Sequence, residues 1–417
     1  MTLCFAAGFC LAGTVLTLSE AENLALGYSP RLKSLAAEQK AYEQRSLAQK
    51  TQSYPKLTLD GSYRYITTVP EIELPARSMS PVKMGDNTNY SVGPALNWTV
   101  WDSGGVKNTY RSAAAAWEAK KHEGEAARLQ VLFASRAAYF QVALASEQEE
   151  LLSDALKLAN AQYEDIKLNV KAGTKSRADE LKAHQEVLAR MRQLSQSKSD
   201  KASALRELSA VTGQTGYAGL KIESIDTLLG IFERFERTSL DPKHPGLEAL
   251  AKYAQSFDYS GRAAGSGNLP KLQLSVKSTL DYPNTTKLES FNQNTAAAAF
   301  SWPLFESGAS QKRGVENEEY SKAYSGRKNQ LESDLKKDWD KALEQLASLK
   351  EQKQINDISV LETVELSAIT YKAYKTGSIS FIEVENANFK ALEAKMQSAK
   401  TKVQMLMNLA VLASISK

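Results

Sequence analysis

The chain has 417 residues, a length that allows two or three domains. Of these residues 42% are hydrophobic and 24% charged, which is typical of folded proteins. Its net charge of +4 is small for this length, and no basic run is interleaved with aromatic residues, so we expect no nucleic acid partner. Cysteine occurs only at positions 4 and 10, which excludes a disulfide framework and a thiolate metal site from the rest of the chain.

The N-terminus carries a short apolar segment. Residues 2–16 are uncharged and too few to span a bilayer. We predict a signal peptide over residues 1–16, with Ala12 as the candidate cleavage site; a buried N-terminal segment and a lipidated Cys10 are the alternatives. Beyond residue 16 no stretch approaches the ~20 apolar residues that a membrane-spanning helix needs, so any membrane span must be made of strands.

The chain contains an internal repeat. SPRLKSLAAEQKAY from Ser29 parallels HPGLEALAKYAQSF from His244, with an offset of 215 residues that also relates YPKLTLDGSYRY to LPKLQLSVKSTLDY. WTVWDSGG from Trp98 parallels WPLFESGA from Trp302, with an offset of 204. The change of offset means that the first copy carries 11 extra residues between Pro55 and Trp98, which predicts a longer loop there.

Each repeat is expected to hold two strands followed by a long helical hairpin. The repeats cover residues 17–213 and 244–417, and a linking segment covers 214–243. The expected elements, in chain order, are strands over 56–66 and 89–101, helices over 103–170 and 177–212, strands over 271–282 and 293–305, and helices over 307–375 and 379–414.

The expected strands alternate apolar and polar residues. In KLTLDGSYRY, leucine and tyrosine alternate with polar residues, which is the period of a strand with one apolar and one polar face. A length of ~10 residues suits a tilted transmembrane strand; a soluble sandwich with its apolar face in the core is the alternative. Aromatic residues near the strand ends are candidates for interfacial belts. They are Tyr63, Tyr65, Trp98, Trp101, Trp302 and Phe305.

The long helices lack proline and are amphipathic. Their apolar residues recur mostly at three- and four-residue spacing, as in coiled-coil seams, and each helix would be ~100 Å long at 1.5 Å per residue. Gly173 and Gly377 mark the turns to the return helices. Asp102 and Glu306, each followed by serine, are expected to cap the first turns of the long helices.

A sheet of four strands leaves two open edges. In lipid every unpaired backbone group costs several kcal/mol, so the chain is expected to oligomerise. Bacterial barrels start at about eight strands, so two copies are the minimum, and three copies would give a twelve-stranded barrel with a water-filled lumen.

Several segments carry a resemblance to a known family: LTLSEAENLALGYSPRL, YPKLTLDGSYRY, WTVWDSGG, WPLFESGA and YKAYKTGSISFIEVENANF. With the doubled architecture, they make the chain beyond its signal segment resemble the outer-membrane efflux proteins, the TolC-like family. The resemblance implies a mainly α fold with a transmembrane β part. The expected assembly is a homotrimer whose 12-stranded β-barrel lies in the lipid of a Gram-negative outer membrane and continues as an α-helical barrel in the periplasm.

The resemblance also implies partners and cargo. A periplasmic adaptor protein and an inner-membrane pump would dock on a closed periplasmic tip and open it, as in tripartite efflux and type I secretion. Drugs, toxic small molecules or secreted proteins would then pass to the exterior.

The resemblance further implies residue roles at the tip. Gly377 corresponds to the inner hairpin turn, and residues six and nine positions later correspond to acids that line the entrance. This chain has Glu383 and Asn386 there, so we expect one ring of three carboxylates, which favours cations. Tyr374 corresponds to the family's gating tyrosine; a core aromatic residue is the equal alternative.

Adaptor contacts are expected at both turns. The residues implied by the resemblance are Gly173, Thr174, Ser176, Gly377, Ser378 and Ser380. The first turn is basic, with Lys171, Lys175 and Arg177, and a merely solvated basic turn is the alternative.

No catalytic, cofactor or metal site is expected. GRAAGSGNLPK, from Gly261, lacks the Gly-Lys-Ser/Thr ending of a P-loop. The three histidines lie far apart in sequence without acidic or thiol partners at ligand spacing, and no G-x-S-x-G elbow occurs. The rival to an export duct is a soluble coiled-coil scaffold or periplasmic structural protein, which would have no reason to carry four strands of membrane-spanning length.

Overall fold

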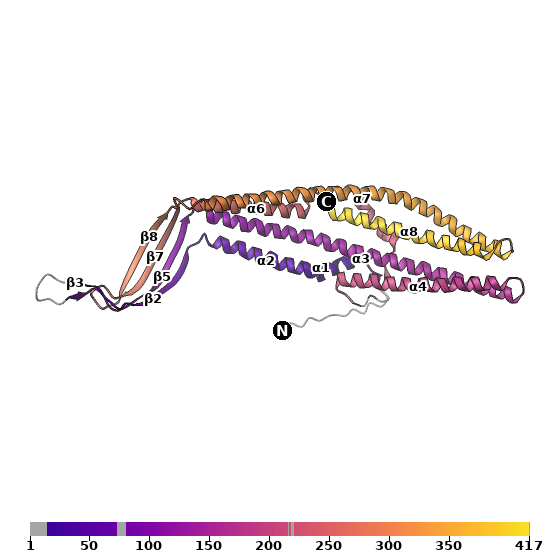
Figure 1. The fold of residues 1–417 in the computed structure, drawn as a ribbon, viewed down its shortest axis with the longest axis horizontal. Coiled ribbons are helices and arrows are strands. Elements are labelled where there is room, and N and C mark those ends of the chain that lie inside the picture. Colours follow the sequence, from indigo (N-terminus) through magenta and orange to yellow (C-terminus); the bar gives the residue numbers. More distant parts are fainter. Residues whose placement is uncertain (1–14, 73–80, 216, 218–220, 417) are drawn as a thin grey trace. The chain divides into compact units, whose positions relative to one another are not determined.

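The computed structural model describes residues 15–72, 81–215, 217 and 221–416, and most of them are helical (Figure 1). The helices are α1 (Leu18–Tyr28), α2 (Pro30–Thr51), α3 (Gly105–Lys171), α4 (Arg177–Thr212), α5 (Ile225–Phe232), α6 (Pro245–Gly265), α7 (Ala309–Lys375) and α8 (Phe381–Ile415), with 3-10 turns η1 (Glu233–Arg237) and η2 (Ser266–Asn268). The strands are β1 (Val15–Leu16), β2 (Lys56–Tyr65), β3 (Glu71–Ile72), β4 (Val82–Lys83), β5 (Thr88–Trp101), β6 (Lys221–Ile222), β7 (Lys271–Tyr282) and β8 (Phe291–Ser301).

The chain divides into two compact units. Residues 36–122 and 247–329 form one unit, called the sheet unit below. The remaining described residues form the other, called the hairpin unit because it contains the α3–α4 and α7–α8 turns. The boundaries fall within α2, α3, α6 and α7, so each of these helices contributes residues to both units.

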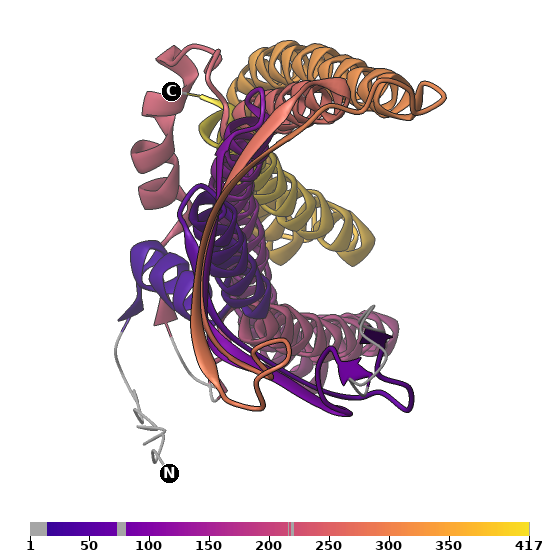
Figure 2. The same ribbon diagram turned by 90° about the vertical axis from the view of Figure 1, so that its left-hand side faces the viewer.

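The sheet unit holds one antiparallel sheet of four strands in the order β2-β5-β7-β8, which is strongly curved (Figure 2). Leu57 pairs with Leu96, which pairs in turn with Val276. The apolar positions of neighbouring strands therefore share one face, as the alternation predicts. In the described chain β2 and β8 are the edge strands, and each has a neighbour on one side only.

The central pairing of the sheet depends on one glycine. A Cβ placed on Gly93 would lie 1.9 Å from the carbonyl oxygen of Ser278, so no other residue fits between β5 and β7 at this point. Pro94 follows directly and cannot donate to a ladder, and the pairing of β5 with β7 resumes at Ala95, which pairs with Lys277. The irregularity is a local feature of the kind that bends a strand.

The strand-to-helix junctions have the same construction in both repeats. Asp102 accepts hydrogen bonds from the backbone N–H groups of Gly104 (3.1 Å) and Val106 (2.5 Å), and Glu306 accepts one from Ser310 (2.8 Å). The predicted capping role of these two acids is confirmed. Because each capping acid and the residues after it precede the first helical turn, α3 begins at Gly105 and α7 at Ala309, two residues beyond the predicted starts.

Strand β8 ends earlier than the sequence predicts. Its last residue is Ser301, whereas the predicted strand runs to residue 305. Pro303 lacks a backbone donor and has a fixed φ, which explains why the ladder stops before it. Trp302 and Phe305 consequently lie on the connection to α7 and not on the strand.

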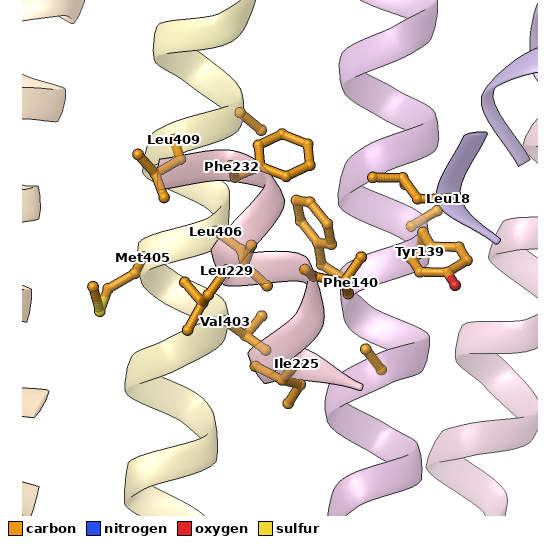
Figure 3. Packing of buried hydrophobic residues seen from close by; sticks show 14 of the residues in the cluster. Leu18, Tyr139, Phe140, Ile225, Leu229, Phe232, Val403, Met405, Leu406 and Leu409 are labelled. Carbon is orange, nitrogen blue, oxygen red and sulfur yellow. The ribbon is translucent and has the colours of Figure 1, made fainter. Parts of the chain in front are cut away.

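The main core of the hairpin unit forms around α5 (Figure 3). Phe232 packs edge-on against Phe140 of α3, with ring centroids 5.4 Å apart. Leu406 and Leu409 of α8 complete the contact. The segment 214–243, interpreted from sequence as a link between repeats, thus supplies the helix that joins α3 to α8.

The chain's first described residues are part of this core. Val15 and Leu16 form β1, which pairs in parallel with β6. The hydroxyl of Tyr139 donates to the Leu16 carbonyl (2.6 Å) and accepts from the backbone N–H of Glu223 (3.0 Å). The predicted signal segment therefore overlaps the fold at positions 15 and 16, while the candidate cleavage site and Cys10 lie outside the described residues.

Within residues 15–72, 81–215, 217 and 221–416, none of the helices is both long and apolar enough to cross a bilayer.

Replacing Phe232 by alanine tests whether α5 is a structural centre. Phe232 is 2% exposed, and truncating a buried phenylalanine costs about 3–5 kcal/mol of unfolding free energy. We expect a large drop in the thermal midpoint measured by circular dichroism. Ile231→Ala on the same helix is the control, because Ile231 is 42% exposed and its loss should shift the midpoint little. Equal midpoints for the two variants would contradict the assignment.

Candidate functional site

The two helical hairpins of the hairpin unit end in matching turns. Gly173 and Gly377 have φ values of 76° and 80°, the left-handed conformation that favours glycine at a helix C-terminus. Thr174 N–H donates to the Asn169 carbonyl (2.9 Å), and Ser378 N–H donates to the Ala373 carbonyl (3.0 Å). These two bonds are related by the repeat offset of 204, so the turns are one motif used twice.

The residues implied as adaptor contacts are all accessible in this chain. Gly173, Thr174, Ser176, Gly377, Ser378 and Ser380 are exposed. Ser176 also caps α4, because its hydroxyl accepts from the backbone N–H of Asp179 (3.1 Å). Exposure makes these turns available to a partner, and their contact with an adaptor stays a prediction.

Tyr374 lies in a small apolar cluster near the turns. Its side chain is 3% exposed and packs against Phe381, with ring centroids 5.4 Å apart. Ile166 of α3 and Ala183 of α4 belong to the same cluster. Tyr374 is therefore a core aromatic residue in this structure, and the cluster holds the α3–α4 hairpin against the α7–α8 hairpin.

Burial affects the ionisation of this tyrosine. Desolvation, and next the negative charge of Asp179, raise the pKa of Tyr374 to about 12. The phenol is consequently neutral at physiological pH, and any contribution it makes at the tip is through packing and not through charge.

Lys175 crosses from the first turn to the second hairpin. Its Nζ donates to the Tyr374 carbonyl (2.7 Å) and lies 4.1 Å from the centroid of the Tyr374 ring. The Tyr374 carbonyl also accepts from the backbone N–H of Gly377 (3.0 Å). Carbonyls at the end of a helix carry partial negative charge that favours a cation, and the ring face adds a cation–π attraction. Lys175 is half-buried, whereas Lys171 and Arg177 are exposed. Of the three basic residues of the first turn, Lys175 therefore contacts the second hairpin, and Lys171 and Arg177 are exposed to solvent.

A second contact runs in the opposite direction, from α7 to α3. Asp165 accepts a hydrogen bond from the Tyr371 hydroxyl (2.6 Å) and pairs with Lys375 (2.9 Å). The bond from Tyr371, followed by that from Lys375, lowers the pKa of Asp165. Burial and the bond to Asp165 raise the pKa of Tyr371. The carboxylate is therefore charged and the phenol neutral over the physiological range.

A third contact lies further from the turns. Asn388 of α8 donates to Gln162 Oε1 on α3 (2.9 Å) and accepts from the Ser367 hydroxyl on α7 (2.6 Å). Gln162 is buried, so its amide needs this partner. In the described part of the chain, polar bonds therefore tie the hairpins together at successive levels beside the apolar cluster.

Glu383 and Asn386 occupy an exposed face of α8. They are three residues apart and so lie on the same side of the helix. Glu383 is in the first helical turn, where the helix dipole stabilises a carboxylate. In the part of the chain that the structure describes, neither residue forms a hydrogen bond or ion pair to the other hairpin, and the predicted entrance residues lie apart from the contacts that hold the tip.

The residues that bond the two hairpins to each other carry no motif that predicts this role. Asp165, Lys175, Tyr371 and Lys375 form the contacts nearest the turns. The spacing of Tyr371, Tyr374 and Lys375 on one helix face was available as a signal. Their partners on the first hairpin were not, because that pairing depends on the packing of helices roughly 200 residues apart in sequence.

The predicted belt residues are all exposed side chains of the sheet unit. Tyr63 pairs with Tyr90, and Trp98 pairs with Leu274. Tyr90 and Trp98 are eight residues apart on β5, or about 26 Å at ~3.3 Å per residue. With the ~35–45° tilt of barrel strands, this separation projects to about 19–22 Å along the membrane normal, somewhat less than the ~25 Å height of the apolar band of membrane barrels.

The chain matches a protein-family model described as outer membrane efflux protein over residues 22–214 and 240–416. The chain belongs to the outer membrane efflux protein family. This is a family of transport channels and not of enzymes. Membership supports the prediction of an export channel and not the alternative of a soluble scaffold. No curated protein sequence matches the chain.

Solved structures of the same fold include three outer-membrane proteins. CmeC of Campylobacter jejuni has a TM-score of 0.75 and 16% identity, covering 95% of this chain and 85% of that one. VceC of Vibrio cholerae has a TM-score of 0.76 and 16% identity, covering 95% of each chain. The open state of MtrE from Neisseria gonorrhoeae has a TM-score of 0.75 and 15% identity, covering 95% and 88%.

The Lys175 contact is testable by hydrogen exchange. A bond from a charged donor contributes about 1.5–3 kcal/mol, so Lys175→Ala should speed local amide exchange in the last turn of α7 by ~10-fold or more. Lys171→Ala, in the same turn but exposed, is the control and should leave the rates unchanged. The contact has no structural role if both variants exchange like the original protein.

The Asp165 contact predicts a pH dependence. The folded pKa lies below the usual value of 3.8, so the stabilisation is complete above that value and is lost as pH falls through the folded pKa. Protection of the Tyr371–Lys375 amides, corrected for intrinsic exchange, should stay constant from pH 7 to pH 5 and fall below pH 3.8. Asp165→Asn should show the low protection at every pH. A fall between pH 7 and pH 5 would refute the assignment.

Proposed function

We propose that the chain is the outer-membrane exit duct of a tripartite efflux or type I secretion system, passing substrates from a pump and an adaptor to the exterior. The observation that carries the proposal is the sheet, which has one apolar exposed face and two unpaired edge strands. Efflux through the outer membrane is the function of the family. The assembly and the partners are the parts proposed here.

Three copies would close the sheet into a barrel of twelve strands. Successive strands in the order β2-β5-β7-β8 are antiparallel, so β8 runs opposite to β2. When β8 of one copy pairs with β2 of the next, the alternation continues without interruption around the ring. A ring built this way has no free edge, and its polar strand faces would line a wet lumen.

The proposed location is the outer membrane of a Gram-negative bacterium, with the helices in the periplasm. The apolar face, which includes Leu57 and Leu59, would face lipid, because both side chains are more than two-thirds exposed in the single chain. The helical hairpins would continue the lumen as an α-helical barrel. The exposed turns at Gly173 and Gly377 would receive a periplasmic adaptor coupled to an inner-membrane pump.

The contacts between the hairpins supply a closed state for such a duct. Lys175 and Lys375 each reach the opposite hairpin, and Lys175 belongs to the turn proposed to contact the adaptor. A partner that binds this turn therefore competes with the bond to α7. Docking would release the tip without disturbing the core around Phe232.

The entrance proposal makes a prediction for planar bilayers. Three Glu383 carboxylates in a ring would favour cations, so Glu383→Gln should lower the cation-to-anion permeability ratio of the purified protein by ~2-fold or more at low salt, where screening is weak.

The matched variant is Asn386→Asp, which would add a second ring on the same face and should raise the ratio. The original protein should show small cation-selective conductance. Anion preference in both the original protein and Glu383→Gln would overturn the entrance proposal, and the absence of any conductance would overturn the duct.

A further inference from the structure

A hollow of about 400 Å³ lies in the sheet unit where the first repeat passes from strand to helix. Its lining includes Lys50 and Ser53 at the end of α2, Trp98 on β5, and Lys107 and Tyr110 on α3. No residue of the tip or entrance belongs to it. Its size suits a small ligand or the headgroup of a larger one.

The hollow begins where the apolar face of the sheet ends. Trp98 follows Leu96 on that face, and Leu96 pairs with Leu57, which is 70% exposed. The indole Nε1 of Trp98 donates to the Ser53 carbonyl (3.0 Å). The apolar strand face and the polar end of α2 are thereby joined, which is the arrangement expected of an amphipathic ring at a lipid–water boundary.

The hollow carries uncompensated positive charge. Lys50 and Lys107 are exposed, and across the described ranges neither has an ion-pair partner. Asp102 also lines the hollow, but its two carboxylate oxygens accept from the N–H groups of Gly104 and Val106. Asp102 keeps its negative charge, so the charged lining is two lysines against one carboxylate and is net positive. Among the described residues neither lysine is paired with Asp102, and both ammonium groups remain available to an anion.

The second repeat provides an internal comparison. Its junction keeps the same tryptophan bond, from Trp302 Nε1 to the Asn268 carbonyl (3.2 Å). By the repeat offsets, however, the positions of Lys50, Lys107 and Tyr110 correspond to Gly265, Gln311 and Gly314. The fold thus requires the tryptophan but not the lysines, so structure alone does not account for the cationic lining of the first repeat.

We propose that this hollow binds the phosphate of a phospholipid headgroup, with Lys50 and Lys107 on the phosphate and the acyl chains along the apolar face at Leu57 and Leu59. Lysine is a compact cation suited to phosphate, and basic pockets beside membrane spans bind lipid headgroups. The inference rests on the proposed function, because it needs the apolar face to lie in a membrane. It adds one specific lipid site per chain, in the leaflet on the helical side.

The test compares two double variants with the same change of charge. Lys50→Gln with Lys107→Gln removes the two positive charges that line the hollow. Lys40→Gln with Lys121→Gln removes two exposed lysines from the same two helices, α2 and α3, outside the hollow. Purified protein in detergent is titrated with dipalmitoyl phosphatidylglycerol, and retained lipid is counted by native mass spectrometry. We expect one tightly retained lipid per chain in the original protein and in the control. The first variant should bind it roughly 30-fold more weakly, on the scale of the surface contribution of two lysines.

Equal retention by all three proteins would overturn the proposal. Inorganic phosphate at 10-fold excess over the lipid distinguishes the two sources of phosphate: retained lipid supports the proposal, and displaced lipid means that the site takes free phosphate. Lipid retention is measured without conduction, so a protein that binds the lipid but does not conduct would count against the duct and not against the site.

A gain-of-site variant uses the second repeat. A Cβ at Gly265 meets no atom within 4 Å, so Gly265→Lys with Gln311→Lys can place two lysines at the matching junction. We expect a second retained lipid per chain. An unchanged stoichiometry would contradict the claim that the lysine pair decides binding.

Discussion

The unpaired backbone groups of the two edge strands are the constraint on which the proposed assembly depends. β2 and β8 each have a neighbour on one side only, and in lipid an unpaired N–H or C=O group costs several kcal/mol. The cost over a strand of ten residues exceeds the total stability of an ordinary domain, about 5–15 kcal/mol. If the apolar face lies in lipid, as we propose, the sheet requires other copies of itself, and the alternating strand direction would permit a closed ring.

The hairpin unit distributes its stabilisation unevenly. Around Phe232 and Leu406, large side chains from several elements are fully buried, each worth about 1.5–3 kcal/mol. Near the turns the apolar cluster is small and is supplemented by polar bonds. The bond from the half-buried Lys175 is worth about 1.5–3 kcal/mol, and the partly exposed pair of Asp165 with Lys375 about 1 kcal/mol or less. In the proposed duct, a partner that binds the turns would supply energy of that size, and the turns would separate while the core stays packed.

Much of the architecture could be predicted because it follows local rules. The two-residue period identified β7 over residues 271–282, and acids at the junctions identified the helix caps. Other features depend on contacts distant in sequence. Helix α5, with eight residues, is too short for periodicity to reveal that Phe232 is central. The contact of Lys175 with α7 could not be inferred, because the sequence of one hairpin does not determine which residues of the other hairpin pack against it. Tyr374 could be placed by resemblance, but its burial against Phe381 could not be predicted from the sequence, and its gating role stays a prediction.

The central claim is that three chains form one duct, and the most direct measurement is the mass of the purified protein in detergent. Multi-angle light scattering with the detergent contribution subtracted gives the number of chains per particle. We expect three chains per particle and no smaller species at low protein concentration, because both edge strands of each chain need a hydrogen-bonding partner. A stable particle of one or two chains would contradict it, since either would leave β2 and β8 unpaired or require a barrel of fewer than twelve strands.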